Sequence, residues 1–204
     1  PCEGKWNFDH DNRERPPRDG REWPSITLFE HDDIDNDILQ NLDDFWGAYP
    51  KGVWPVTREQ ALIRLDEFVN GALKPFGPYE DAMLGKEWKL AHSVLSSSLN
   101  IGLLHPMEVV RAVEQAYTDG DAPINSVEGF IRQVIGWREY VWGLYWLWMP
   151  EYRSQNFLEA NRDIPPAFRE QGSTEMSCIR GAMDHLHEYA YTHHIERLML
   201  FGNL

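Results

Sequence analysis

The sequence is poor in cysteine, in positive charge and in long apolar runs, and each shortage excludes a class of protein. Two cysteines among 204 residues cannot build a disulfide framework, and they suit a reducing compartment. The apolar run from Val141 to Met149 is too short to cross a bilayer, and no secretory signal is evident. We therefore expect a cytoplasmic protein with no membrane partner.

Positive charge is scarce enough to bear on nucleic-acid binding. The 19 Lys and Arg residues are outnumbered by 33 Asp and Glu residues, which gives a net charge of −14. Duplex-binding proteins normally carry a basic surface, because Lys and Arg make the phosphate contacts. The acidity is concentrated in residues 30–44, which include seven acidic residues and no Lys or Arg. The charge therefore counts against DNA binding, although it is compatible with a positive patch elsewhere.

Hydrophobic periodicity predicts one all-α domain, large enough for a core and without an internal repeat or a strand pair. We expect an acidic amphipathic helix over 35–49, a helix capped by Thr57 with Gln60 at the capping-box position, and a helix that starts at Pro106. Their expected inward-facing residues are Ile38, Leu42, Phe45 and Trp46; then Ala61, Leu62, Leu65, Phe68 and Val69; then Val109, Val110, Val113 and Ala116.

The stretch from Phe130 to Pro150 predicts a central helix of about five turns with an unusual aromatic content. Arg138 and Glu139 turn away from its apolar face, which carries one polar residue, Gln133. The other members of that face are Phe130, Val134, Trp137, Val141, Leu144 and Trp148. This pattern is typical of a core helix, and it also suits a flat aromatic ligand or a nucleic-acid base.

A serine-rich segment, residues 91–106, offers hydroxyl groups at the start of a helix. Helix amino termini bind phosphate because their N–H groups lack partners, but serine is equally common as an ordinary helix cap. Cys178 alone is typical of a small buried residue. The histidines at 185, 187, 193 and 194 contain no pair at i,i+4 spacing, which disfavours a zinc site.

Four stretches, taken together, resemble the flavin domain of the photolyase/cryptochrome family. The first runs from Gly136 to Tyr140 and continues from Gly143 to Tyr152. The others are 4–9 with Asn12 and Arg13, 76–83 leading into 92–102, and 191–199. They occur in the family's order over nearly the whole chain. With a glycine before Trp137, the sequence most resembles the bacterial iron–sulfur branch of the family, whose members repair (6-4) photoproducts.

The resemblance implies an all-α, FAD-binding domain of photolyase type. The segment from His92 to Ser96 is similar to the family loop that holds the FAD pyrophosphate, although many members have Thr where His92 stands. Tyr79 is similar to an aromatic residue that flanks the flavin. The implied cofactor-binding residues are Tyr79, His92, Ser93, Leu95, Ser96, Asn100, Phe130, Gln133 and Arg138.

The same resemblance implies three catalytic residues, Gln133, His193 and His194, and one substrate-binding residue, Trp137. Members that act on cyclobutane dimers carry a carboxylate near Gln133, so the amide favours the (6-4) class. The histidine pair is the implied site of proton transfer, for which an imidazole that titrates near neutrality is suited. Trp137 would stack on the flipped lesion.

The expected iron–sulfur pattern is incomplete in this sequence, and one position departs from it. Cys178 is similar to the first thiolate ligand of a 4Fe-4S cluster, but the other three would lie beyond residue 204, and Cys2 falls outside the pattern. We therefore expect that these 204 residues do not assemble a cluster. Glu170 stands where the branch commonly has an electron-relay tryptophan, which argues against flavin photoreduction through that position.

We expect residues 1–25 to be a linker from an absent amino-terminal α/β domain and residues 26–204 to be part of the FAD domain. The predicted protein is a monomeric carbon–carbon lyase that uses light to repair (6-4) photoproducts in UV-damaged DNA, with an unknown antenna pigment. A cryptochrome-like photoreceptor is the alternative, motivated by the acidity and by Glu170. A third outcome is that the chain alone exposes apolar surface and is inactive.

Overall fold

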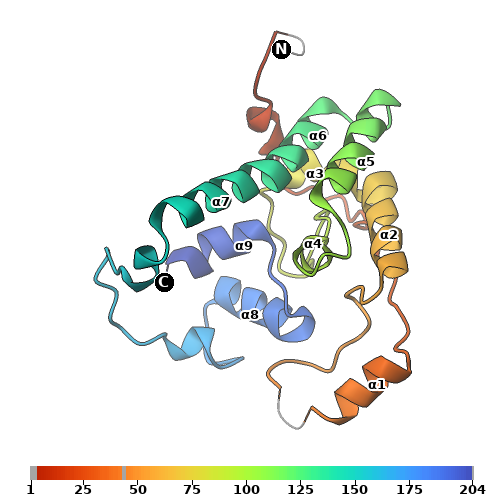
Figure 1. Ribbon diagram of the computed structural model, residues 1–204. Coiled ribbons are helices and arrows are strands. Elements are labelled where there is room, and N and C mark those ends of the chain that lie inside the picture. Colours follow the sequence, from red (N-terminus) through yellow and green to blue (C-terminus); the bar gives the residue numbers. More distant parts are fainter. Residues whose placement is uncertain (1–3, 43–44, 204) are drawn as a thin grey trace.

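The computed structural model describes residues 4–42 and 45–203, and within them the chain is helical (Figure 1). The described residues contain no β-strand beyond one isolated bridge between Leu84 and Glu87, so the all-α prediction is confirmed. None of the described helices is long and apolar enough to cross a membrane. The α-helices are α1 (Asp33–Gln40), α2 (Arg58–Glu67), α3 (Leu73–Tyr79), α4 (Ser96–Asn100), α5 (Pro106–Thr118), α6 (Ile124–Ile131), α7 (Trp137–Trp148), α8 (Ser177–Tyr189) and α9 (His194–Met199).

The core lies among α2, α3, α5 and α6. The capping box of Thr57 and Gln60 is present at the start of α2, and Pro106 opens α5, as predicted. All four expected inward residues of α5 are buried. For the helix capped by Thr57, the prediction that Leu62 faces inward is wrong, because this residue is 40% exposed. The other predicted inward residues are buried or, for Val69, partly buried: Ala61, Leu65, Phe68 and Val69.

The central helix is longer than predicted and contains an irregular turn. A π-helical turn, Arg132–Gly136, joins α6 to α7, so the helical run begins at Ile124 and ends at Trp148. The wider turn changes the direction of the residues after it relative to a regular α-helix. As a result Arg138 lines the same cavity as Gln133 and Trp137, and the expectation that it turns away is wrong.

The outer part of this helix does not pack as the apolar pattern suggested. None of the residues of α7 is buried, and Val141 is 57% exposed. In Figure 1, α7 extends away from the core above α9.

The acidic helix is shorter than predicted. It ends at Gln40, and Asp32 caps it through a capping box with Asp35. Its apolar residue Ile38 is exposed rather than inward-facing. Asp43 and Asp44, which were predicted to lie within this helix, are outside the described residues.

The irregular segments on either side of α1 are held by one buried cation. The guanidinium of Arg64 donates hydrogen bonds to the carbonyl oxygens of Thr27 and Val53, both at 2.8 Å, and to Glu67 at 2.6 Å. It also lies 5.1 Å from the centre of the Phe29 ring. A buried charge is tolerated only when it is paired in this way.

Helices α3 and α6 cross at close range at Gly77. Its N–H donates to Ser126 Oγ at 3.1 Å, and that hydroxyl donates to the carbonyl of Lys74 at 3.0 Å. A Cβ on Gly77 would lie 2.7 Å from Ser126 Cα and 2.8 Å from its backbone nitrogen. The two helices can approach this closely only with glycine at position 77.

Gly77→Ala is therefore expected to destabilise the fold by about 2 kcal/mol or more, because the backbone of α6 must move. Gly71→Ala is the matched control, since its Cβ would meet nothing within 4 Å and alanine is favoured in helices. Urea denaturation of both variants measures the difference. Equal stability of the two variants would contradict the account of the crossing.

Candidate functional site

A cavity of about 600 Å³ lies where the segment before α4, the α6–α7 helix and α9 meet. That volume is within the range of small-molecule and cofactor sites. Val94, in the segment before α4, has a left-handed φ of 49°, which is uncommon for a β-branched residue. The turn lies between Ser93 and Leu95, and all three residues line the cavity. Strained backbone of this kind is often found at ligand sites.

Most of the predicted site residues meet in this cavity. Ten of them line it: His92, Ser93, Leu95, Ser96, Asn100, Phe130, Gln133, Trp137, Arg138 and His194. Three do not. Tyr79 contacts the ring of Trp23 instead, His193 lies buried behind the wall, and Cys178 is exposed at the start of α8.

Sequence reasoning missed several lining residues, of which Arg197 and Tyr191 matter most. Arg197 follows His194 by three residues on α9, so helical spacing from the histidine could have identified it. Tyr191 precedes α9, and its burial raises the pKa of its hydroxyl, which therefore stays protonated at neutral pH. Phe76 forms part of the wall and was not predicted because it reads as an ordinary core residue.

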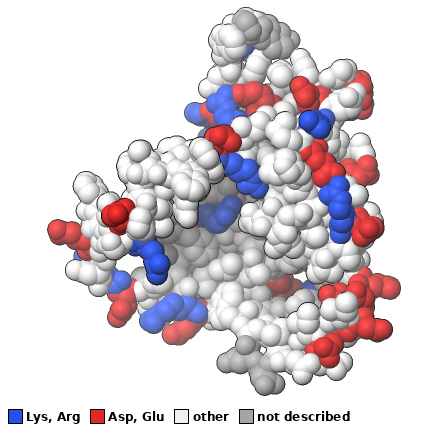
Figure 2. All heavy atoms as spheres, viewed as in Figure 1, with Lys and Arg blue, Asp and Glu red and all other residues white. Residues whose placement is uncertain are grey.

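The cavity is cationic although the chain is acidic. Among the described residues, Arg138 and Arg197 are its only charged lining side chains apart from the titratable histidines, and no carboxylate lines it. Within residues 4–42 and 45–203, neither guanidinium forms an ion pair. Figure 2 shows Lys and Arg side chains in the central hollow, whereas Asp and Glu gather along the edge formed by α1, α2 and α5. The site is therefore suited to an anionic ligand.

Polar groups without partners also indicate a ligand. The hydroxyls of Ser97 and Ser98 and the Nε2 atom of His92 are buried and have no hydrogen-bond partner among the described residues. Ser97 and Ser98 do not line the cavity, whereas His92 does. Buried polar groups are nearly always satisfied in folded proteins, so the unsatisfied nitrogen of His92 calls for an explanation. Ordered water or a polar ligand provides one.

At the cavity mouth, the indole N–H of Trp137 donates to Gln133 Oε1 at 2.9 Å. This bond fixes the amide so that its NH₂ group remains available to a ligand. Trp137 is 61% exposed, so its ring is available for stacking.

Three imidazoles cluster at the inner wall: His92 and His194 line the cavity, and His193 lies behind them. The rings of His92 and His193 stack at 4.8 Å, and His92 meets His194 edge to face at 5.1 Å. Burial lowers the pKa of His193 to about 4 and that of His92 well below its usual value. It also lowers the pKa of His194, against the opposing effect of Asp81, whose Oδ1 lies 3.3 Å from the ring Nε2. The idea that the pair titrates near neutrality is therefore wrong for His193, which is neutral at pH 7.

The residues present do not fit a 4Fe-4S cluster. Such a cluster needs four thiolate ligands, and Cys178 is the one cysteine within the described residues. No group of three or more His, Cys, Asp or Glu side chains in the described ranges could hold a metal ion.

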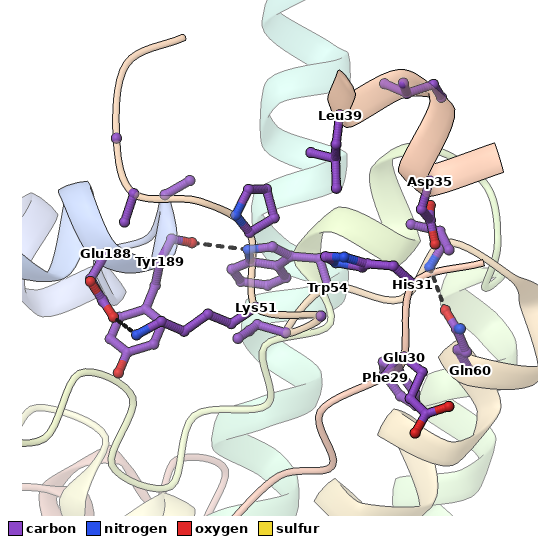
Figure 3. Close-up of a pocket in the computed structure, with 18 of the residues that line it drawn as sticks. Phe29, Glu30, His31, Asp35, Leu39, Lys51, Trp54, Gln60, Glu188 and Tyr189 are labelled. Atoms are coloured by element: carbon purple, nitrogen blue, oxygen red, sulfur yellow. Dashed lines mark hydrogen bonds and ion pairs between the residues drawn. The ribbon is translucent and has the colours of Figure 1, made fainter. Parts of the chain in front are cut away.

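A second cavity, of about 350 Å³, lies between the residue 29–56 segment and the end of α8 (Figure 3). The indole N–H of Trp54 donates to the carbonyl of Tyr189 at 2.9 Å, and Lys51 pairs with Glu188. The ring of Trp54 also lies 5.6 Å from that of Tyr191, a residue of the first cavity. None of the sequence-predicted site residues lines this second cavity.

Comparison with known proteins supports the resemblance. The chain is 42% identical, over 207 residues, to a (6-4) photolyase of Agrobacterium fabrum; the alignment covers all of this chain and 40% of the relative. This chain belongs to the photolyase/cryptochrome family. The family described as deoxyribodipyrimidine photo-lyase-related protein matches residues 1–49. An uncharacterized protein of Acanthamoeba polyphaga mimivirus is 43% identical over 68 residues, which are 33% of this chain and 52% of that protein.

The fold agrees with this membership in the photolyase/cryptochrome family. The crystal structure of a bacterial class III photolyase from Agrobacterium tumefaciens matches with a TM-score of 0.53 and 22% identity, covering 80% of this chain and 32% of that one. That likeness concerns the helical fold alone. The chain spans less than half the length of both Agrobacterium photolyases.

The buried imidazole of His193 predicts acid sensitivity for this photolyase-family chain. Its pKa in the folded chain, about 4, is below the value of 6.5 expected when unfolded, so the unfolded chain binds more protons between these pH values. The stabilising contribution is present above pH 6.5 and is lost as the pH falls toward 4, by about 3 kcal/mol in all. Urea denaturation at pH 7.5 and pH 5 measures the part of this loss that falls between those two pH values, about 2 kcal/mol.

His193→Gln is expected to show a smaller loss of stability between these pH values than the wild type. His10→Gln is the control, because that imidazole is exposed. If His193→Gln keeps the wild-type pH dependence, the neutral state assigned to His193 is incorrect.

Proposed function

We propose that this chain forms part of the flavin domain of a photolyase that repairs (6-4) photoproducts in UV-damaged DNA. The observation that carries the proposal is the convergence of ten predicted residues on one cationic cavity, in a chain 42% identical to a (6-4) photolyase. We assign residues 26–204 to this domain and residues 1–25 to a linker.

The segment from Ser93 to Asn100 is proposed to hold the FAD pyrophosphate. It supplies hydroxyls and an amide, and Arg138 and Arg197 supply the positive charge that a pyrophosphate requires. Tyr79 lies outside the cavity, so its proposed contact with the cofactor would be indirect.

Phe130 and Gln133 are proposed to face the isoalloxazine ring, and Trp137 to stack on the flipped lesion at the mouth of the cavity. Reduced FAD, when bound, supplies the electron that blue light drives onto the photoproduct. The protein orients the two partners and excludes water. The Gln133 amide can hydrogen-bond without taking up a proton at neutral pH. Its oxygen accepts from Trp137, which leaves its NH₂ group to donate.

His194 is the better candidate for the proton donor of the histidine pair. It lines the cavity, and Asp81 favours its protonated form, whereas His193 is shielded behind the wall. His193 does not reach the cavity, so it is proposed to influence the reaction through His92 and His194, which do. Cys178 would serve a 4Fe-4S cluster only if further thiolates came from outside these 204 residues.

The photoreceptor alternative was motivated by the acidity and by Glu170. Among the described residues no carboxylate lines the cavity, whose own charged side chains are arginines, so the net charge no longer argues against DNA. The observations therefore favour repair over signalling.

Arg138→Gln combined with Arg197→Gln is expected to weaken FAD binding roughly 10- to 100-fold, because each arginine would make charge-assisted hydrogen bonds to phosphate. Quenching of flavin fluorescence on titration with the chain measures the affinity. Arg111→Gln is the control, since Arg111 is an exposed cation on α5. Unchanged affinity in the double variant would rule out the cavity as the pyrophosphate site.

The repair reaction needs a separate assay. We expect the protein at its natural length, reduced and under blue light, to reverse a thymine–thymine (6-4) photoproduct in an oligonucleotide. Normal flavin photoreduction without reversal of the lesion would instead support the photoreceptor.

A further inference from the structure

A buried carboxylate lies behind the histidine wall. Glu196, in the first turn of α9, is 5% exposed. Its Oε1 atom is 3.0 Å from Nδ1 of His185 and 3.6 Å from Nε2 of His193. Its Oε2 atom and both ring nitrogens of His193 are buried without a hydrogen-bond partner among the described residues. A buried carboxylate in this position lowers the stability of the fold unless the neighbouring rings donate hydrogen bonds to it.

The turn between α8 and α9 creates this arrangement. Ala190 has a left-handed φ of 51° and ends α8, so the chain reverses before α9 begins at His194. His185 and Glu196, eleven residues apart, thereby come into contact. In Figure 1, α8 and α9 lie side by side below α7.

The carboxylate constrains which nitrogen of His193 carries the proton. A neutral imidazole has one N–H and one lone pair, and the group nearest to each nitrogen selects the tautomer. A lone pair on Nε2 would face the negative oxygen of Glu196 at 3.6 Å, which is repulsive, whereas an N–H there is attracted to it. Nδ1 then keeps the lone pair.

We propose that Glu196 is a positioning residue that fixes His193 as the Nε2–H tautomer and stabilises the ring when it accepts a proton at Nδ1. This role rests on the proposed function, because a tautomer fixed next to His92 and His194 matters chemically where His194 exchanges a proton with substrate. A proton taken up at Nδ1 leaves His193 positive, and the adjacent carboxylate offsets that charge.

Other charged groups act on the same ring. Burial has the largest effect and favours the neutral form of His193. Glu196 favours the protonated form, whereas the neighbouring His and Arg side chains favour the neutral form. The groups facing the cluster are His92 from the segment before α4, His185 from α8, and His194, Glu196 and Arg197 from α9. Glu196 is the one group in this set that favours a proton on His193.

Nuclear magnetic resonance of the chain labelled with ¹⁵N-histidine tests the proposal, because ring nitrogen shifts report the tautomer. Neither cofactor nor DNA is needed. At pH 7.5 we expect His193, identified by the signal lost in His193→Gln, to be the Nε2–H form. Glu196→Met keeps a similar volume but removes the acceptor, and is expected to give a mixture of tautomers. An unchanged tautomer in Glu196→Met would overturn the proposal.

Two further variants complete the test. Glu196→Asp retains the carboxylate and is expected to keep the wild-type tautomer, as is the control Glu114→Gln on the exposed face of α5. If Glu196→Met does not fold, Glu196→Gln replaces it. That variant is expected to lower the pH midpoint of His193 protonation by about one unit, because an opposite charge is removed. A midpoint equal to that of the wild type would contradict the role.

The outcome for Glu196 is independent of the outcome for repair. A tautomer change in Glu196→Met together with no photoproduct reversal by the wild type would uphold the positioning role and reject the proposed function. If the wild type repairs, Glu196→Gln is expected to shift the pH profile of the repair rate, whereas Glu114→Gln leaves it unchanged.

Discussion

The close crossing of α3 and α6 is the constraint on which the site depends. Because Gly77 lets the two backbones meet at Ser126, the phenylalanines that flank the crossing, Phe76 and Phe130, come within 5.6 Å of each other. Both rings are buried in the core, and both also line the cavity. This part of the inner wall is therefore an extension of the hydrophobic core, and helix packing sets the position of the two rings. Sites built on rigid elements in this way hold their geometry without a ligand.

Burial controls the chemistry of this wall as strongly as residue identity does. An exposed histidine pair would titrate close to neutral pH, but the stack of His92 on His193 lies in the core and is kept neutral. Burial also lowers the pKa of His194, on the cavity side, although the carboxylate of Asp81 opposes this effect. Adjacent residues of one type thus differ in protonation behaviour because they differ in depth. This division of roles follows from the turn that begins α9, since it directs one ring inward and the next outward.

The sequence was most informative where one local rule decides the outcome. Thr57 with Gln60, Pro106 and the α5 stripe follow from capping and periodicity, and the structure agrees. Periodicity failed at the π turn of residues 132–136, because a regular helix was assumed and the direction of Arg138 therefore came out wrong. Periodicity also failed at α7, because an apolar face predicts burial but does not identify the element that packs against it. The convergence of distant residues on a cavity came from the resemblance, since spacing alone cannot bring Ser93 and His194 together. The depth of His193 and the contact between His185 and Glu196 depend on tertiary packing that no local pattern encodes.

The separation of charge between α1 and the cavity gives the molecule an electric dipole as well as a net charge. Near a polyanion, the net charge of a protein determines how strongly the whole molecule is repelled. Its dipole determines how the molecule is rotated. Beside a polyanion, the acidic helix would be repelled and the arginine-lined opening attracted, so orientation would be selected before contact. An acidic protein of this kind meets an anionic surface less often than a basic one does, but a larger share of those encounters begins with the opening in front.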